Sequence, residues 1–129
     1  MTSGTTLWTG RVLSGIAVLF LLFDGAIKLV PIQPVIDSLR ELGYPATDSL
    51  ARFLGVVTLI CTALYAWPRT ALLGAILLTG IMGGAIASHL RLGDPLFTHT
   101  LFGVYLGLFL WGGLWLRDER VRRVMPLLD

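Results

Sequence analysis

Four long apolar runs, separated by short polar segments, dominate the pattern of hydrophobic and polar positions along the chain. Each run is about 20 residues long, and a helix of that length spans about 30 Å, which matches the hydrocarbon core of a bilayer. Prolines flank most of the runs, where they stop or start helices. The pattern predicts four transmembrane helices, over residues 12–30, 49–67, 71–90 and 96–116.

The composition indicates that the solvent is lipid. The 129 residues are 55% hydrophobic and only 14% charged, whereas a soluble domain carries about 25% charged residues. The net charge of +2 is too small for a nucleic-acid-binding surface, so no nucleic-acid partner is expected. We interpret the first run as a span rather than a signal peptide, because no small-residue cleavage site follows Phe23.

The connection between the first two spans, residues 31–48, is the only long polar segment. Pro34 suits a first helical position, and after it apolar and charged residues alternate with helical spacing. This pattern favours a short amphipathic helix on the membrane surface, and a plain interfacial loop is the alternative. The apolar side comprises Val35, Ile36, Leu39 and Leu42, and the charged side Asp37, Arg40 and Glu41.

The predicted fold is therefore an all-α membrane protein. Residues 1–129 form one domain, a four-transmembrane-helix bundle with a short amphipathic interfacial helix between helices 1 and 2. Small residues recur at intervals of four in the last two spans, where they let helix backbones approach closely in lipid. We expect these stripes to make the helix contacts: Gly80, Gly83, Gly84, Ala87 and Ser88 in the third span, and Gly103, Gly107, Gly112 and Gly113 in the fourth.

An even number of spans places both termini on one side of the membrane. That side carries six basic residues and the other side four. The positive-inside rule then predicts that both termini are cytoplasmic. The six are Arg11, Arg69, Arg117, Arg120, Arg122 and Arg123, and the four are Lys28, Arg40, Arg52 and Arg91.

Ionisable residues gather at the end of the spans opposite the termini. Asp24 lies too deep in the first span for its short side chain to reach water, and intramembrane carboxylates mark functional sites by default. His89 and His99 flank the turn between the third and fourth spans. Because imidazole changes protonation near neutral pH, these three residues are the candidate catalytic, proton-handling groups. Lys28 and Arg91 are candidates to tune or anchor them.

Local pairing is the alternative for several of these residues. Lys28 follows Asp24 by four residues, so the two can neutralise each other on one helix. Arg91 and Asp94 can stabilise the turn before Pro95, although Asp94 is also a candidate ligand-binding residue. The two histidines and an aspartate match no metal-site spacing, so no metal is predicted. A single cysteine in the chain excludes an intrachain disulfide.

Aromatic residues near the same end are candidate walls for a lipophilic ligand such as a quinone. A cavity between apolar walls with a few polar groups suits such a ligand. Equally, each aromatic residue fits an interfacial anchor or a core position. These residues are Tyr44, Phe97, Phe102 and Tyr105.

Several segments spread over nearly the whole chain resemble the DoxX-like family of small four-span bacterial membrane proteins. They are Phe23-Asp24-Gly25 with Lys28-Leu29, Leu42-Gly43-Tyr44-Pro45, the run from Pro68-Arg69-Thr70 to Leu78-Thr79-Gly80, His89-x-Arg91-x-Gly93-Asp94-Pro95-Leu96-Phe97-x-His99, and Trp111-Gly112-Gly113-Leu114-Trp115 through Asp118. The resemblance implies a protein of the bacterial plasma (inner) membrane. Namesake relatives are membrane subunits of a thiosulfate:quinone oxidoreductase, which implies a redox role.

The sequence thus supports two functions from different classes. The first is a component of a membrane redox system that binds a quinone or a similar lipophile near the outer face, with a partner redox subunit or a second copy of the chain. The second is a non-enzymatic scaffold or accessory subunit, whose polar layer only specifies helix packing. A transporter is the third hypothesis, and it would require an oligomer, because four spans leave little room for a substrate pathway within one copy of the chain. The sequence pattern alone does not identify a cofactor. The redox hypothesis implies a quinone.

Overall fold

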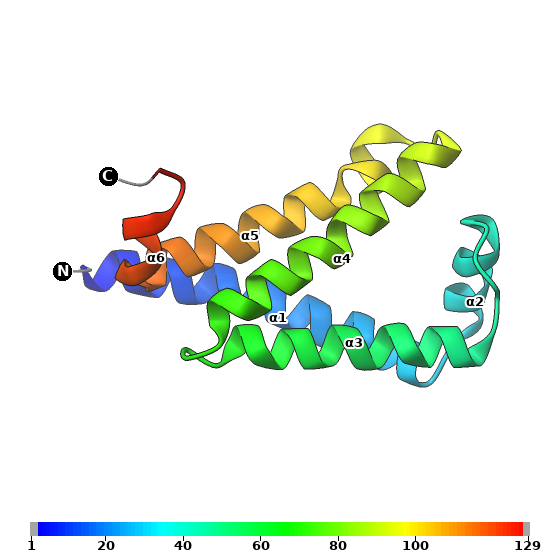
Figure 1. Cartoon of the computed structure of the whole chain (residues 1–129), viewed down its shortest axis with the longest axis horizontal. Coiled ribbons are helices and arrows are strands. Elements are labelled where there is room, and N and C mark those ends of the chain that lie inside the picture. Colours follow the sequence, from blue (N-terminus) through cyan, green and yellow to red (C-terminus); the bar gives the residue numbers. More distant parts are fainter. Residues whose placement is uncertain (1–2, 128–129) are drawn as a thin grey trace.

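The structure is a computed structural model that describes residues 3–127, except for the side chains at positions 99 and 100. Within that part the chain is helical and has no strand. The elements follow one another along the chain in Figure 1 as α1 (Gly4–Leu29), α2 (Gln33–Glu41), α3 (Asp48–Ala66), α4 (Ala71–Leu92), the π-helical turn η1 (Leu96–Thr100), α5 (Phe102–Arg117) and α6 (Glu119–Val124).

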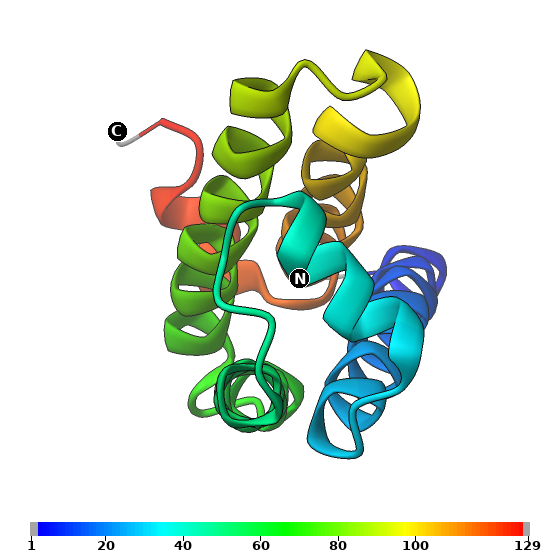
Figure 2. The same cartoon turned by 90° about the vertical axis from the view of Figure 1, so that its right-hand side faces the viewer.

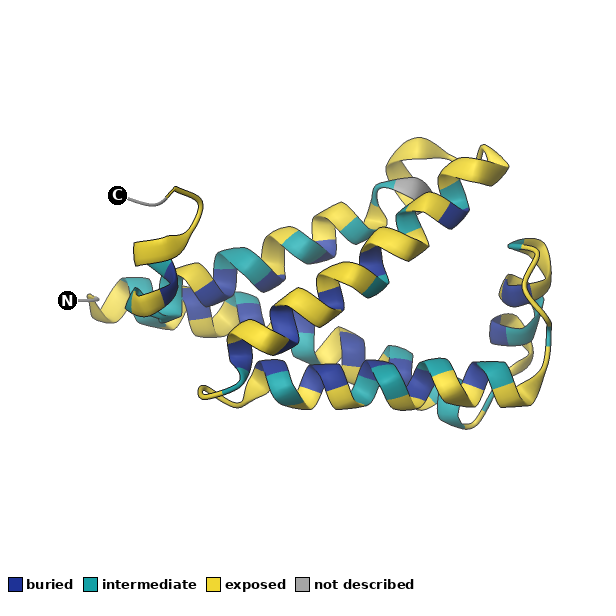
Figure 3. Cartoon of the chain, in the orientation of Figure 1, coloured by how far each residue is buried: buried dark blue, intermediate teal, exposed yellow. Residues whose placement is uncertain are grey.

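Four segments are long and apolar enough to cross a membrane: α1, α3, α4 and the run formed by η1 and α5. This confirms the predicted all-α membrane fold. Figure 3 shows buried stripes turned inward and exposed positions along the outside of the long helices. Many of the exposed positions are large apolar residues such as Leu19, Phe23 and Leu108. Such a surface is stable only when lipid surrounds it.

The helix ends differ from the predicted spans at both termini. Helix α1 begins at Gly4 rather than at residue 12, because the side chain of Ser3 accepts a hydrogen bond from the backbone N–H of Thr6 and caps it. At the other terminus, the side chain of Asp118 caps the short helix α6, which was not predicted. Both additions are polar helical turns, so a search for apolar runs misses them.

The fourth span is also irregular at its start. Its first turn is η1, in which the N–H of Leu101 donates to the carbonyl of Leu96 at 2.9 Å, five residues back. Helix α5 follows only from Phe102. The segment predicted as the fourth span, 96–116, therefore begins with a wider π-helical turn after Pro95, a detail that hydrophobicity does not indicate.

Helix α2 confirms the predicted amphipathic helix and excludes the loop alternative. Its buried residues Val35 and Leu39 pack with Ala51 of α3. Pro34 lies in its first turn, and Gly43, with a φ of 83°, follows its last turn in the left-handed conformation. Helix α2 lies across one end of the bundle, in front of the long helices in Figure 2.

The long helices pack closely where a glycine meets a backbone. Gly10 and Gly113 bring α1 against α5, and Gly25 and Gly55 bring α1 against α3. Gly74 lies against the end of α3. In Figure 1 the helices converge at the end that holds both termini, whereas α4 and α5 diverge from α1 and α3 toward the end that carries α2.

The predicted small-residue contacts are only partly correct. In the fourth span, a Cβ at Gly113 or Gly103 would meet atoms of a neighbouring helix at 3 Å or less. In the third span, Gly80, Gly83 and Gly84 have no such neighbour within 4 Å. These three glycines are exposed and point away from the core of this chain, whereas Ser88, at the end of the same stripe, is buried.

Tyr65, at the end of α3, ties three helices together. It is fully buried, and its hydroxyl donates a hydrogen bond to the carbonyl of Leu110 on α5 at 2.6 Å. The same hydroxyl accepts from Ser14 on α1 at 2.8 Å. A buried hydroxyl between two partners satisfies all three groups away from water.

Replacing Tyr65 with phenylalanine is expected to lower the free energy of unfolding by about 1 kcal/mol, because Ser14 and Leu110 lose their shared partner while the ring still fits. Reversible unfolding in mixed micelles measures the change. Tyr105→Phe is the matched control, since Tyr105 is 38% exposed. Equal losses for the two variants would show that the Tyr65 hydroxyl contributes nothing specific.

Candidate functional site

The candidate residues with described side chains lie toward the end of the bundle that carries α2. Asp24 and Lys28 are in the last two turns of α1, and His89 and Arg91 are in the last turn of α4. Asp94 follows in the turn before η1. The predicted site therefore spans two helices that both end at this side of the bundle (Figure 1).

Asp24 and Lys28 form a local pair. The Lys28 Nζ donates to the Asp24 carboxylate at 2.8 Å, and the two side chains are 28% and 27% exposed for Asp24 and Lys28 respectively. They are four residues apart on α1, the spacing at which an acid and a base meet on one helix face. Lys28 thus stays on Asp24, and the structure shows no described contact from Asp24 to His89 or Arg91.

His89 pairs with Asp94. The His89 Nδ1 lies 2.6 Å from an Asp94 carboxylate oxygen, and the side chains are 25% and 31% exposed. Gly93 makes this contact geometrically accessible. Its φ of 69° ends α4 in the left-handed conformation, and the next N–H, that of Asp94, donates back to the carbonyl of His89 at 3.2 Å. This turn of the backbone brings the Asp94 carboxylate next to the His89 imidazole.

Arg91 and Tyr44 connect the segment after α2 to the end of α4. The Arg91 guanidinium donates to the carbonyl of Leu42. The Tyr44 hydroxyl donates to the Ser88 hydroxyl at 2.7 Å, and Ser88 in turn donates to the carbonyl of Gly84 at 2.8 Å. Arg91 therefore holds a loop carbonyl rather than Asp94, which was its expected partner in the turn.

The aromatic candidates lie on the outside of this end. Phe97, Phe102 and Tyr105 are 71%, 42% and 38% exposed. Phe102 packs on Phe20 of α1, with ring centroids 5.1 Å apart. The sequence analysis missed Phe20, because nothing in a continuous apolar run marks which residue faces a neighbouring helix. The three candidate rings are thus exposed on η1 and α5 instead of lining a cavity in the core.

One candidate lies outside the described side chains. The backbone of His99 is in η1, but its side chain is not among those that the structure describes. Its proton-handling role stays a prediction. Among the described residues, no three His, Cys, Asp or Glu residues are grouped so that they could hold a metal ion. Cys61 is buried in the core of the bundle.

These features define a small multi-pass membrane protein with polar groups concentrated at the ends of apolar helices. The model of the DoxX-like family matches residues 12–113. The chain belongs to the DoxX-like family. No curated protein and no solved structure matches the chain.

Proposed function

We propose that this protein is a component of a bacterial membrane redox system that handles protons for a quinone or a similar lipophile. The observation that supports this most directly is the His89–Asp94 pair, with 2.6 Å between imidazole and carboxylate. An aspartate on one ring nitrogen orients an imidazole, so that its other nitrogen is positioned to pass a proton to a ligand. The pair lies at the end of α4 and in the turn before η1, between two apolar segments long enough to cross a membrane.

The surrounding residues fit a ligand that arrives from lipid. The exposed rings of Phe97, Phe102 and Tyr105 offer apolar surface close in sequence to Asp94. Reduction of a quinone consumes two electrons and two protons. In this proposal the electrons come from a partner redox subunit, and the His89–Asp94 pair exchanges protons with the quinone oxygens. Asp24 and Lys28 tune the charge at the same end of the bundle.

The proposed orientation places this end at the outer face of the bacterial plasma membrane. Both termini then lie in the cytoplasm, with six of the ten basic residues. The positions of Trp8, Trp67 and Trp115 near the ends of α1, α3 and α5 suit anchoring at the cytoplasmic interface, where indole rings prefer to lie.

A photoreactive short-chain quinone tests this proposal on the purified full chain in lipid nanodiscs. We expect crosslinks in the segment 89–105, located by peptide mass spectrometry. His89→Gln and Asp94→Asn each weaken labelling about tenfold, which corresponds to the loss of one hydrogen bond to the ligand or its orienting group. Arg40→Gln is the control, since Arg40 is exposed on α2 and belongs to a separate pair with Asp37.

Crosslinks elsewhere in the chain, or labelling that His89→Gln leaves unchanged, would contradict the proposal. The scaffold function is the second candidate, and the Asp24–Lys28 pair favours it because each charge already satisfies the other. If the protein is a scaffold, His89→Gln lowers thermal stability without changing quinone labelling. The two functions therefore predict opposite results for the same variant.

A further inference from the structure

The end of the bundle that holds both termini contains a cavity of about 390 Å³. It is a different site from the His89–Asp94 pair, because it lies at the start of α1 and the end of α5. Leu7, Pro68, Ala71 and Leu114 supply its apolar lining. Three arginines and two carboxylates supply the rest. The balance of those charges determines which ligand fits.

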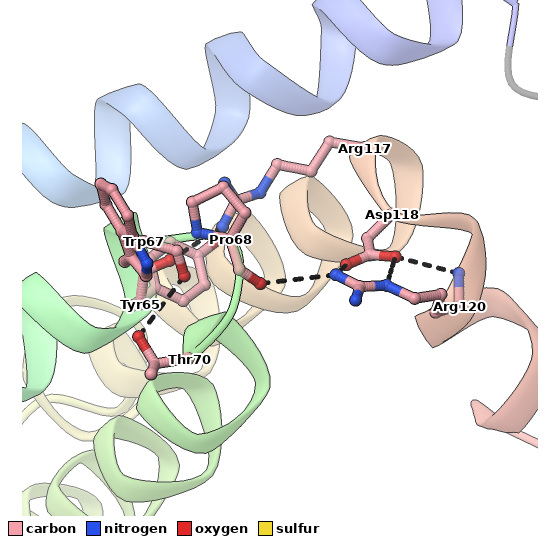
Figure 4. A network of polar contacts seen from close by, with 7 residues as sticks. All are labelled: Tyr65, Trp67, Pro68, Thr70, Arg117, Asp118 and Arg120. Atoms are coloured by element: carbon pink, nitrogen blue, oxygen red, sulfur yellow. Dashed lines mark hydrogen bonds and ion pairs between the residues drawn. The ribbon is translucent and has the colours of Figure 1, made fainter.

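One arginine of the cavity is already neutralised. Arg120 donates to both carboxylate oxygens of Asp118, through Nε at 3.1 Å and Nη2 at 2.9 Å (Figure 4). These hydrogen bonds from Arg120 hold the pKa of Asp118 below its usual range, so the carboxylate stays ionised. The second carboxylate belongs to Glu119. One of its oxygens lies 4.0 Å from the Nη2 of Arg123, four residues later on α6. Both acidic groups are therefore engaged.

Arg117 brings a charge that no carboxylate pairs with among the described ion pairs. Its guanidinium lies over the Tyr65 ring, 4.9 Å from the centroid, and its Nη2 donates to the Tyr65 carbonyl at 3.0 Å. Figure 4 shows the side chain reaching from the end of α5 toward Tyr65 and Pro68. Its Nε is buried and has no hydrogen-bond partner within the described part of the chain.

Arg11, on α1, brings a second arginine charge to the lining of the cavity. It is exposed on α1, and its guanidinium lies over the Trp8 ring, 5.3 Å from the centroid. Among the ion pairs of residues 3–127, none includes Arg11. Two guanidinium groups from α1 and α5 thus line one cavity without a carboxylate bound to either.

We propose that this cavity binds a phosphate group between Arg11 and Arg117. A guanidinium matches phosphate oxygens with two parallel N–H donors, and basic pockets between transmembrane helices hold anionic headgroups. The phosphate belongs either to an anionic phospholipid or to a soluble phosphate. The apolar lining favours the lipid, because acyl chains or glycerol carbons can lie against Leu7 and Leu114.

Binding there joins α1, α5 and the turn between α3 and α4, since the cavity is lined from all three. A bound phosphate would therefore make the folded chain more resistant to heat. This inference does not depend on the redox proposal, because the His89–Asp94 pair and the cavity lie at opposite ends of the bundle.

The test uses the full chain in zwitterionic detergent, with phosphatidylglycerol, phosphatidylcholine or inorganic phosphate added. Native mass spectrometry reports bound lipid, and a thermal melt reports stabilisation. We expect phosphatidylglycerol to bind and to raise the melting temperature, and phosphatidylcholine to do neither. Arg11→Gln should weaken binding about fivefold, as expected for one basic group at a lipid headgroup. Arg11 makes no described hydrogen bond, so this variant is expected to fold.

Arg69→Gln is the matched control. It removes the same charge from the same end of the chain, and Arg69 is exposed and does not line the cavity. Arg117→Lys keeps the charge but removes the planar guanidinium with its parallel N–H donors, and it should also weaken binding. Stabilisation by inorganic phosphate that Arg11→Gln abolishes would identify the soluble anion as the source. Equal binding of the two lipids without any effect of phosphate, or equal effects of Arg11→Gln and Arg69→Gln, would overturn the inference.

Discussion

Gly74→Ala is expected to cost the most stability of any single methyl group added to this chain. A Cβ at this position would lie 2.3 Å from the Tyr65 nitrogen, 2.6 Å from the Tyr65 Cα and 2.8 Å from the Leu64 carbonyl carbon. All three are backbone atoms, so no side-chain rotation relieves the overlap. The start of α4 must move away from the end of α3. Overpacking of this kind costs about 3 kcal/mol.

The measurement is the free energy of unfolding in mixed micelles, with Gly84→Ala as the control on the same helix. A Cβ at Gly84 meets nothing within 4 Å. Alanine is also the better helix former by about 1 kcal/mol, so Gly84→Ala is expected to leave stability unchanged or to raise it. If Gly74→Ala unfolds at the same denaturant concentration as Gly84→Ala, the close contact between α3 and α4 is wrong.

Gly113→Ala is expected to have the next largest effect, because it separates α1 from α5. A Cβ there would lie 2.4 Å from the Ser14 Oγ, 2.7 Å from the Ser14 nitrogen and 3.0 Å from the Gly10 carbonyl oxygen. Two of those atoms belong to the backbone of α1. Displacing Ser14 also disturbs its hydrogen bond to Tyr65. We expect a loss of about 2 to 3 kcal/mol.

The neighbouring glycine provides the comparison for this variant. A Cβ at Gly112 would meet only the Leu13 side chain, at an ordinary 3.9 Å. Gly112→Ala should therefore behave like the unaltered chain in the same unfolding assay. A large loss at position 112 together with a small loss at 113 would mean that α5 is rotated relative to the arrangement described.

The sequence predicted what depends on local pattern. Hydrophobic length alone indicates four spans, and the alternation after Pro34 indicates α2. Which glycines make contacts depends on where another helix lies, and no pattern along one helix records that. Gly80 and Gly84 have the expected spacing but no neighbour, whereas Gly74 carries a close contact within an ordinary apolar run.

The site shows the same division. The Asp24–Lys28 pair was foreseen as one alternative, because four residues bring two side chains to one helix face. The His89–Asp94 pair was not, because it depends on the left-handed turn at Gly93. Arg117 was counted only among the basic residues on the side of the membrane that holds the termini. Its contacts with Tyr65 join residues far apart in the sequence, so only the folded chain brings them together.

The placement of α2 has a consequence for the order in which the bundle loosens. At the end with both termini, separation of the helices must break glycine-backbone contacts and expose the buried Tyr65. At the other end, the segment after α2 is joined to α4 through the Tyr44–Ser88 and Arg91–Leu42 hydrogen bonds. Local opening begins where the fewest buried contacts are lost. Thermal fluctuations are therefore expected to separate α4 first from the segment that follows α2, at the end of the bundle that holds the His89–Asp94 pair.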